Sequence, residues 1–297
     1  MNYVLTGSIG HISKPLAKSL IAAGHQVKII TSKPNRKAEI EKLGAIALVG
    51  SVEDQDFVAG ALAGADAVYL MIPPNFAAPS LSAFQQKVAD VYAAAVQQAG
   101  VKQVVVLSSI GAHMKTGAGP VDGLAYLEDK ISALKDVNAV FLRPSYFYYN
   151  LLNQANIIKH AGIVTSTQPA DYKMILVHPN DIAEIAAKWL LTPDFKGTQV
   201  QYIASDDTNS WQQITDTLTA AVNKQGVPYV ESTDEQSQQA MLQAGVPATF
   251  AEAYAVMGKA LRSGEMQADY WKNKPTQTGK VKLTDFAKEF AAVYNAG

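Results

Sequence analysis

The sequence contains no cysteine among its 297 residues. This absence excludes disulfide bonds, a cysteine nucleophile and thiolate metal sites, and it agrees with a reducing compartment. The sequence also lacks an excess of charge of one sign, because 25 Lys and Arg are balanced by 26 Asp and Glu. A nucleic-acid backbone would need a basic block, and we therefore expect no nucleic-acid ligand.

Long hydrophobic runs and a leader segment are absent too. No apolar run approaches the roughly 20 residues of a membrane span, and the first expected strand starts at residue 2 or 3, which leaves no room for a signal peptide. We therefore expect a cytoplasmic protein without a membrane partner. The five histidines lie far apart, without the close pairing typical of metal sites, and we predict no metal.

A glycine-rich turn stands out after the first apolar run, at residues 3–5, and leads into an expected helix over 15–23. Gly7 permits a tight turn, and Gly10 lets backbone N–H groups approach a pyrophosphate at the helix N-terminus. Ser13 replaces the usual third glycine and should tighten the contact between helix and strand. The residues of this turn predicted to bind a dinucleotide are Gly7, Ser8, Ile9, Gly10, His11 and Ile12.

Short apolar runs alternate with helical patterns along the first two thirds of the chain. The expected strands span residues 3–5, 27–30, 45–49, 67–72, 103–108, 139–143, 173–177 and 200–204; helices are expected over 15–23, 37–43, 55–63 and 81–98. Such alternation predicts an α/β fold with a doubly wound parallel sheet of the Rossmann type, buried on both faces. Loops at the carboxyl ends of the strands should then converge on one crevice.

The pattern changes after residue 204. Helical spacing continues over residues 211–223, 235–243, 249–262 and 283–294, and no strong strand pattern follows. One core rarely grows beyond roughly 250–300 residues. We therefore expect a Rossmann domain over residues 1–204 and a smaller helical substrate or cap region over 205–297, which packs with residues 145–172.

Several short motifs together resemble one family. They are Thr6-Gly7-x-x-Gly10, Glu53-Asp54 after Gly50, Ala61-Leu62-x-Gly64-Ala65-Asp66-x-Val68, Ser108-Ser109-Ile110-Gly111-Ala112, Leu142-Arg143-Pro144-x-x-Phe147-x-x-Asn150 and Asp181-Ile182-Ala183. In this combination the chain resembles the NmrA-like atypical short-chain dehydrogenases/reductases over essentially its whole length. The resemblance implies an NAD(P) cofactor. That family includes NAD(P)H-dependent quinone and azo-dye reductases, and also cofactor-binding regulators without catalysis. Ser51 stands where many relatives have an acid, so its hydroxyl or a backbone carbonyl would contact the adenine.

The loop after the second expected strand indicates which cofactor is preferred. An NAD site usually has an acid there for the ribose 2′-hydroxyl, whereas an NADP site needs positive charge for the 2′-phosphate. Here Ser32, Lys33 and Arg36 lie in a loop with no acid before Glu39. The loop favours NADP(H) over NAD(H), although exposed cations of this kind can also be a solvated surface.

Tyr126 and Lys130 are spaced to lie on one face of a helix. In short-chain dehydrogenases such a lysine lowers the pKa of the tyrosine and holds the nicotinamide ribose, while the tyrosine donates a proton to the substrate carbonyl. Ser109, or Ser108, would complete that catalytic set, and Ser108 and Lys130 would contact the cofactor. The alternative is a half-buried core tyrosine beside a solvated lysine.

Aromatic residues gather after the sixth expected strand, at residues 146–149. Phe147 and Asn150 could stack on and hydrogen-bond to a flat substrate ring, with His113 as a further substrate contact. Tyr146 and the segment Ile72, Pro73 and Pro74 are expected beside the cofactor. The favoured function is NADPH-dependent reduction of a small quinone-like or aromatic compound. The alternatives are a redox-sensing regulator with a protein partner and, by fold analogy alone, a nucleotide-sugar epimerase or dehydratase.

Overall fold

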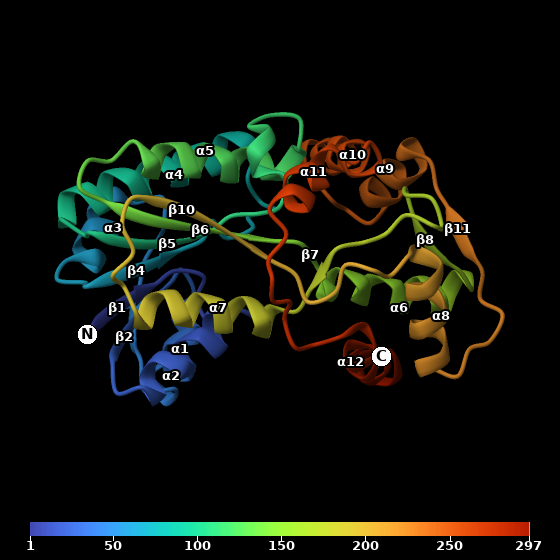
Figure 1. Ribbon diagram of the computed structural model, residues 1–297, viewed down its shortest axis with the longest axis horizontal. Coiled ribbons are helices and arrows are strands. Elements are labelled where there is room, and N and C mark those ends of the chain that lie inside the picture. Colours follow the sequence, from blue (N-terminus) through green and yellow to red (C-terminus); the bar gives the residue numbers. More distant parts are fainter. Residues whose placement is uncertain (297) are drawn as a thin grey trace.

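The computed structural model describes residues 1–296, and a seven-stranded parallel sheet forms its centre (Figure 1). The strands are β1 (Asn2–Leu5), β2 (Gln26–Thr31), β3 (Ile46–Val49), β4 (Ala67–Leu70), β5 (Gln103–Leu107), β6 (Asn138–Pro144) and β10 (Thr198–Ile203). Their order is β10-β6-β5-β4-β1-β2-β3, with every pair parallel. The order reverses between β1 and β4, which is where doubly wound sheets bind nucleotides. The predicted fold class is confirmed.

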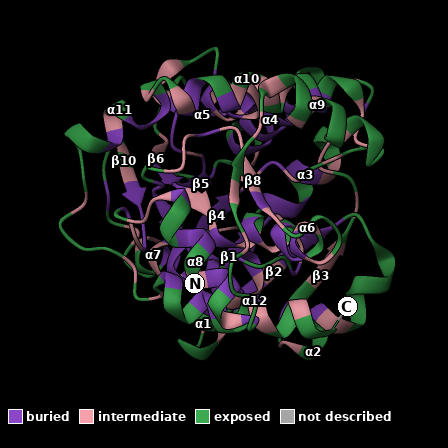
Figure 2. Ribbon diagram, turned by 90° about the vertical axis from the view of Figure 1, so that its right-hand side faces the viewer, coloured by how far each residue is buried: buried purple, intermediate pink, exposed green. Residues whose placement is uncertain are grey.

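Helices cover both faces of the sheet (Figure 1). On one face lie α1 (Ser13–Ala22), α2 (Lys37–Lys42) and α7 (Pro179–Leu191); on the other lie α3 (Gln55–Leu62), α4 (Leu81–Ala99) and α5 (Asp122–Ser132). Leu5 belongs to the apolar cluster on the first face and Val4 to the cluster on the second, and both are fully buried. Burial on both faces explains why the strands are continuous apolar runs, and Figure 2 shows the buried ribbon concentrated in the central strands.

Local sequence signals fix the ends of the helices. The Ser80 hydroxyl accepts the N–H of Ala83 at the start of α4, and Gly100 ends that helix with a φ of 69°. A capping box of Ser210 and Gln213 starts α8 (Trp211–Ala221).

Of the helices in residues 1–296, none combines the length and the apolar character that a bilayer crossing requires.

The C-terminal elements lie beyond the carboxyl ends of the strands (Figure 1). They include α8, α9 (Asp234–Gln243), α10 (Ala248–Arg262), α11 (Glu265–Lys272) and α12 (Leu283–Ala296). Segment 148–176, with η4 (Tyr148–Asn153) and α6 (Gln154–Ala161), shares an apolar cluster with α8 and α12. The fully buried rings of Tyr148 and Phe286 stack at 5.1 Å in this cluster.

One expectation about strands was wrong. Residues 173–177 do not join the central sheet: only β9 (Leu176–Val177) is a strand, and it pairs with β7 (Tyr146–Phe147). A short strand, β11 (Tyr229–Glu231), does occur in the C-terminal region and pairs with β8 (Val164–Ser166). These strands are too short to produce a periodicity visible in the sequence. Each also pairs with a strand that is distant along the chain.

Candidate functional site

The glycine-rich turn has the compact geometry that its sequence predicts. Gly7 has a φ of 86°, and a Cβ there would lie 2.7 Å from Ser13 Oγ and 2.9 Å from Met71 Cγ. Ser13 is buried and its hydroxyl donates a 2.9 Å hydrogen bond to the carbonyl of Thr6. Helix α1 therefore starts tightly against the end of β1, although a serine replaces the third glycine.

The start of α1 leaves backbone donors free. Its N-cap, Ile12, provides no side-chain hydrogen bond. Across residues 1–296, the N–H groups of Ile9, His11 and Ile12 donate no backbone hydrogen bond. Unpaired N–H groups at a helix N-terminus, together with the helix dipole, form an anion site. This turn therefore fits the pyrophosphate of a dinucleotide. The His11 ring lies edge-on against Tyr149, with centroids 4.6 Å apart.

The loop after β2 brings cations and one acid together. Lys14 Nζ lies 2.9 Å from Glu39 Oε1, and Arg36 Nη1 lies 3.3 Å from Glu39 Oε2. The hydrogen bond from Lys14 lowers the pKa of Glu39 below its ordinary value. Lys33 is exposed and, within the described chain, has no acidic partner. The exposed Ser32 lies in the same loop. The loop is basic, but Glu39 already forms ion pairs with two nearby cations, Lys14 and Arg36.

Other expected cofactor residues follow neighbouring strands. The Thr6 hydroxyl accepts the N–H of Met71 at 2.7 Å, which ties the end of β1 to the segment containing Ile72, Pro73 and Pro74. Ser51 is exposed after β3, and its hydroxyl accepts the N–H of Glu53 at 3.1 Å. These segments follow β1, β3 and β4, so the topology brings them to the same edge of the sheet.

Tyr126 and Lys130 do share one face of α5, and the ammonium lies 5.0 Å from the ring centroid. Both, however, have Asp90 of α4 as their partner. The phenol donates to Asp90 Oδ1 at 3.1 Å, and Lys130 Nζ lies 2.7 Å from the same atom. The hydrogen bond to Asp90 raises the pKa of Lys130. In the described part of the chain neither residue lines the cavity that Ser109 lines. These contacts join α5 to α4.

A buried polar network that the sequence analysis missed occupies the opposite face of α5. The guanidinium of Arg143 forms two hydrogen bonds to Glu128, from Nε at 2.9 Å and from Nη2 at 2.6 Å, and the hydroxyl of Ser108 donates to Glu128 at 2.5 Å. Burial alone would lower the pKa of Arg143, but Glu128 raises it. Ser108, expected at the cofactor, is thus engaged by a carboxylate in this structure.

The same network reaches the C-terminal region. Arg143 Nη1 donates to the Tyr202 hydroxyl at 3.1 Å and lies 3.4 Å from Asp269 of α11, to which Tyr202 also donates. Glu128 and Arg143 are 3% and 7% exposed, so solvent is almost excluded from this ion pair. It fixes α11 onto the ends of β6 and β10.

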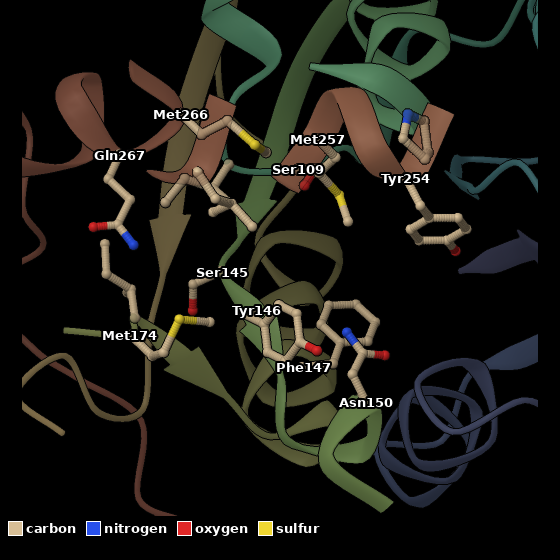
Figure 3. A pocket seen from close by; sticks show the side chains of 14 residues that line it. Ser109, Ser145, Tyr146, Phe147, Asn150, Met174, Tyr254, Met257, Met266 and Gln267 are labelled. Atoms are coloured by element: carbon tan, nitrogen blue, oxygen red, sulfur yellow. The ribbon is translucent and has the colours of Figure 1, made fainter. Parts of the chain in front are cut away.

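A cavity of about 240 Å³ lies between the ends of β5 and β6 and the helices α10 and α11 (Figure 3). The residues that line it are Ser109, Ile110, Pro120, Ser145, Tyr146, Phe147, Asn150, Met174, Ile175, Tyr254, Met257, Leu261, Met266 and Gln267. Three methionines, three aromatic rings and four aliphatic residues form most of the wall, which suits a flat apolar ligand. Burial raises the pKa of Tyr146, so its phenol stays neutral.

Of the residues expected at the substrate, Phe147 and Asn150 line this cavity together with Ser109, and Tyr146, expected at the cofactor, lines it too. His113 lies in η2 (Ala112–Met114) outside the lining, with a buried Nδ1 that has no hydrogen-bond partner within residues 1–296. The sequence analysis missed the lining residues Ser145, Met174, Tyr254, Met257, Met266 and Gln267. The methionines at 257 and 266 in the C-terminal helices were the available signal.

Comparison with known proteins agrees with this geometry. The model of a family described as NAD(P)H-binding matches residues 7–193. The NAD(P)H azoreductase of Xenophilus azovorans is 26% identical to this chain over 297 residues, which is 99% of both proteins. The match to the family model starts at the glycine-rich turn and extends through α7.

Several solved structures share the fold at low identity. The NADPH-dependent quinone oxidoreductase QOR2 of Escherichia coli, complexed with NADPH, has a TM-score of 0.80 at 20% identity and covers 97% of this chain and 99% of its own. The triphenylmethane reductase of Citrobacter sp., complexed with NADP(H), has a TM-score of 0.80 at 17% identity over the same shares. A nucleoside-diphosphate-sugar epimerase of Staphylococcus aureus has 0.76 at 15% identity, covering 97% and 100%. At these identities the likeness concerns the fold.

Proposed function

Because this chain belongs to the NAD(P)H-binding family, we propose that it is an oxidoreductase that uses NADPH to reduce a small, flat, quinone-like or aromatic compound. The observation that carries the proposal is the cavity at the carboxyl ends of β5 and β6. It is walled by methionines and aromatic rings and contains few polar atoms. Its lining contains no lysine or arginine, which argues against a nucleotide-sugar substrate, since a diphosphate would need positive charge.

The chain's own groups fit the cofactor at three places. The unpaired N–H groups of Ile9, His11 and Ile12 would hold the pyrophosphate. Ser32, Lys33 and Arg36 would hold a 2′-phosphate, and Pro73 and Pro74 would lie at the nicotinamide ribose. When bound there, the cofactor supplies a hydride.

The preference for NADPH rests on the charge of the loop after β2. A phosphate at this position would compete with Glu39 for Arg36, whose present bond is 3.3 Å long, and Lys33 is free of acidic partners in residues 1–296. Glu39 reduces the net positive charge. We therefore expect a clear preference for NADPH together with measurable use of NADH.

The side chains that line the cavity would orient the substrate. Phe147, Tyr146 and Tyr254 offer aromatic faces for stacking, while Ser109 and Asn150 offer hydrogen bonds. In the part of the chain that the structure describes, no carboxylate or imidazole lines the cavity, and Tyr126 and Lys130 form hydrogen bonds or ion pairs with Asp90. We therefore assign the proton that completes reduction to water. An electron-poor ring suits this arrangement, because it needs little acid assistance for hydride addition.

The test is loss of NADPH absorbance with a panel of a benzoquinone, a naphthoquinone, an azo dye and a triphenylmethane dye. We expect turnover of at least one quinone with stoichiometric NADPH oxidation, and slower turnover with NADH. Tight cofactor binding without turnover of any compound would refute the enzymatic proposal. It would favour a redox sensor, which must bind the reduced and oxidised cofactors with different affinities.

A further inference from the structure

One polar group in the cavity has no partner. The hydroxyl of Ser145 is buried, with the residue 3% exposed, and within residues 1–296 it makes no hydrogen bond. Ser145 lines the cavity directly after β6, and Figure 3 shows its hydroxyl on the cavity side, beside the Met174 side chain. A buried hydroxyl without a partner costs free energy that folding does not recover.

The backbone holds Ser145 in this position. Its N–H donates to the carbonyl of Ile203 at 3.0 Å, and the next N–H, that of Tyr146, donates to Ile175 at 3.0 Å. The main chain on both sides is therefore fixed by β10 and by the segment before β9. The hydroxyl can rotate, but it cannot leave the wall of the cavity. A fixed backbone and an unpaired side chain together describe a group whose partner is a ligand.

A second donor lies on the same wall. Gln267 of α11 is 6% exposed, and among the described residues its side-chain amide has only one hydrogen bond, a long one of 3.5 Å to the carbonyl of Lys173. Met174 and Met266 lie beside these two residues in the lining (Figure 3). Besides Ser109 and Asn150, the mostly apolar wall thus carries two buried polar side chains, the Ser145 hydroxyl and the Gln267 carboxamide.

We propose that Ser145, assisted by Gln267, binds a carbonyl oxygen of the aromatic substrate; the assignment rests on the proposed function of this cavity. During reduction of a quinone, hydride adds to the ring system and an electron pair moves onto this oxygen. The Ser145 O–H donates a hydrogen bond to the oxygen, and it keeps its own proton. Water then protonates this oxygen, and the extra ring C–H proton moves through water to the second carbonyl oxygen, which gives the hydroquinone. Ser145 therefore selects substrates with a hydrogen-bond acceptor at the edge of a flat ring.

The first experiment compares Ser145→Ala with Ser145→Thr and with the remote control Ser19→Ala, whose exposed hydroxyl bonds only to Pro15. Loss of one neutral hydrogen bond should lower kcat/KM for a quinone roughly three- to tenfold in Ser145→Ala, with NADPH affinity unchanged. Ser145→Thr keeps the hydroxyl and should restore most of the loss. Because the hydroxyl has no partner in the folded chain, Ser145→Ala should unfold at the same temperature as wild type or higher. A lower melting temperature in Ser145→Ala would overturn the assignment, since it would indicate a structural role.

A second experiment separates this inference from the proposed function. Protein saturated with NADP⁺ is titrated calorimetrically with benzophenone, an aromatic ketone that serves as a probe for the carbonyl contact. We expect Ser145→Ala to bind it roughly three- to tenfold more weakly than wild type and Ser19→Ala to bind it equally well. This result stands even where no quinone is turned over, which would refute only the enzymatic proposal. Equal binding by wild type and Ser145→Ala, or no binding by wild type, overturns the role of Ser145.

Discussion

Replacing Arg143 with methionine would leave the carboxylate of Glu128 buried without its cation. The two side chains now share two hydrogen bonds, of 2.9 and 2.6 Å, in a region where they are 7% and 3% exposed. Only the Ser108 hydroxyl would still donate to the carboxylate. Breaking a buried ion pair from one side costs about 3–5 kcal/mol. At roughly 2–4 °C per kcal/mol for a large domain, the melting temperature should fall by about 6–20 °C.

The assay is thermal and denaturant unfolding of Arg143→Met, Glu128→Gln and the double variant Glu128→Gln/Arg143→Met. The double variant buries no unpaired charge, so it should be more stable than Arg143→Met alone, and the cycle should give a coupling of at least about 1 kcal/mol. The exposed pair of Lys37 and Glu41, 3.8 Å apart on α2, is a matched control whose removal should cost well under 1 kcal/mol. A loss below about 1 kcal/mol in Arg143→Met, or a double variant no more stable than it, would refute the reasoning.

Three further predictions concern the cofactor, the reaction and pH. Ser32→Asp should shift the ratio of dissociation constants for NADPH and NADH toward NADH by about tenfold or more, measured by calorimetry, because a carboxylate repels the 2′-phosphate and binds the ribose hydroxyls; an unchanged ratio would contradict the assignment of this loop. Tyr126→Phe should keep most of kcat, since the phenol bonds to Asp90; a loss of roughly 100-fold or more would instead identify Tyr126 as a general acid. Burial raises the pKa of Asp207, but the hydrogen bonds from Lys274 and Tyr270 and the charges of Lys274 and Lys282 together outweigh it, and the pKa lies below the usual 3.8. This carboxylate therefore stabilises the fold above its unfolded pKa, and the contribution is lost as pH falls through the lower folded value. The stabilities of wild type and Asp207→Asn, measured by denaturation, should then differ at pH 6, and the difference should shrink as the pH falls below 3.8; a difference that does not change with pH would contradict this prediction.

The inner strands of the sheet could be predicted because they are buried on both faces. Val4 and Leu5 are adjacent yet belong to clusters on opposite sides of the sheet, so the strand is an unbroken apolar run. The turn at Gly7 could be predicted for a local reason as well, since a side chain there would collide with Ser13. A strand was expected over residues 173–177, but its reduction to β9 and its pairing with β7 outside the central sheet could not be predicted, because two residues carry no period.

The site was less accessible to sequence reasoning because it depends on how helices pack. Spacing placed Tyr126 and Lys130 on one face of α5, which the structure confirms, but spacing does not say which face meets the sheet. That choice is made by Asp90, 36 residues earlier on α4, and by Arg143 on β6, which holds Glu128 on the other face. The part of the cavity wall that α10 and α11 form depends on contacts between residues that are more than 100 positions apart in the sequence. The contact between Arg143 and Asp269 is an example.

The most direct test of the account is calorimetric titration of the purified protein with NADPH, NADP⁺, NADH and NAD⁺ under one set of conditions. The account predicts one site per chain and tighter binding of NADPH than of NADH. It also predicts that Gly7→Ala loses this binding, because the added Cβ would lie 2.7 Å from Ser13 Oγ and displace the turn that presents the free N–H groups. Absence of binding by all four nucleotides, or undiminished binding in Gly7→Ala, would contradict the central claim.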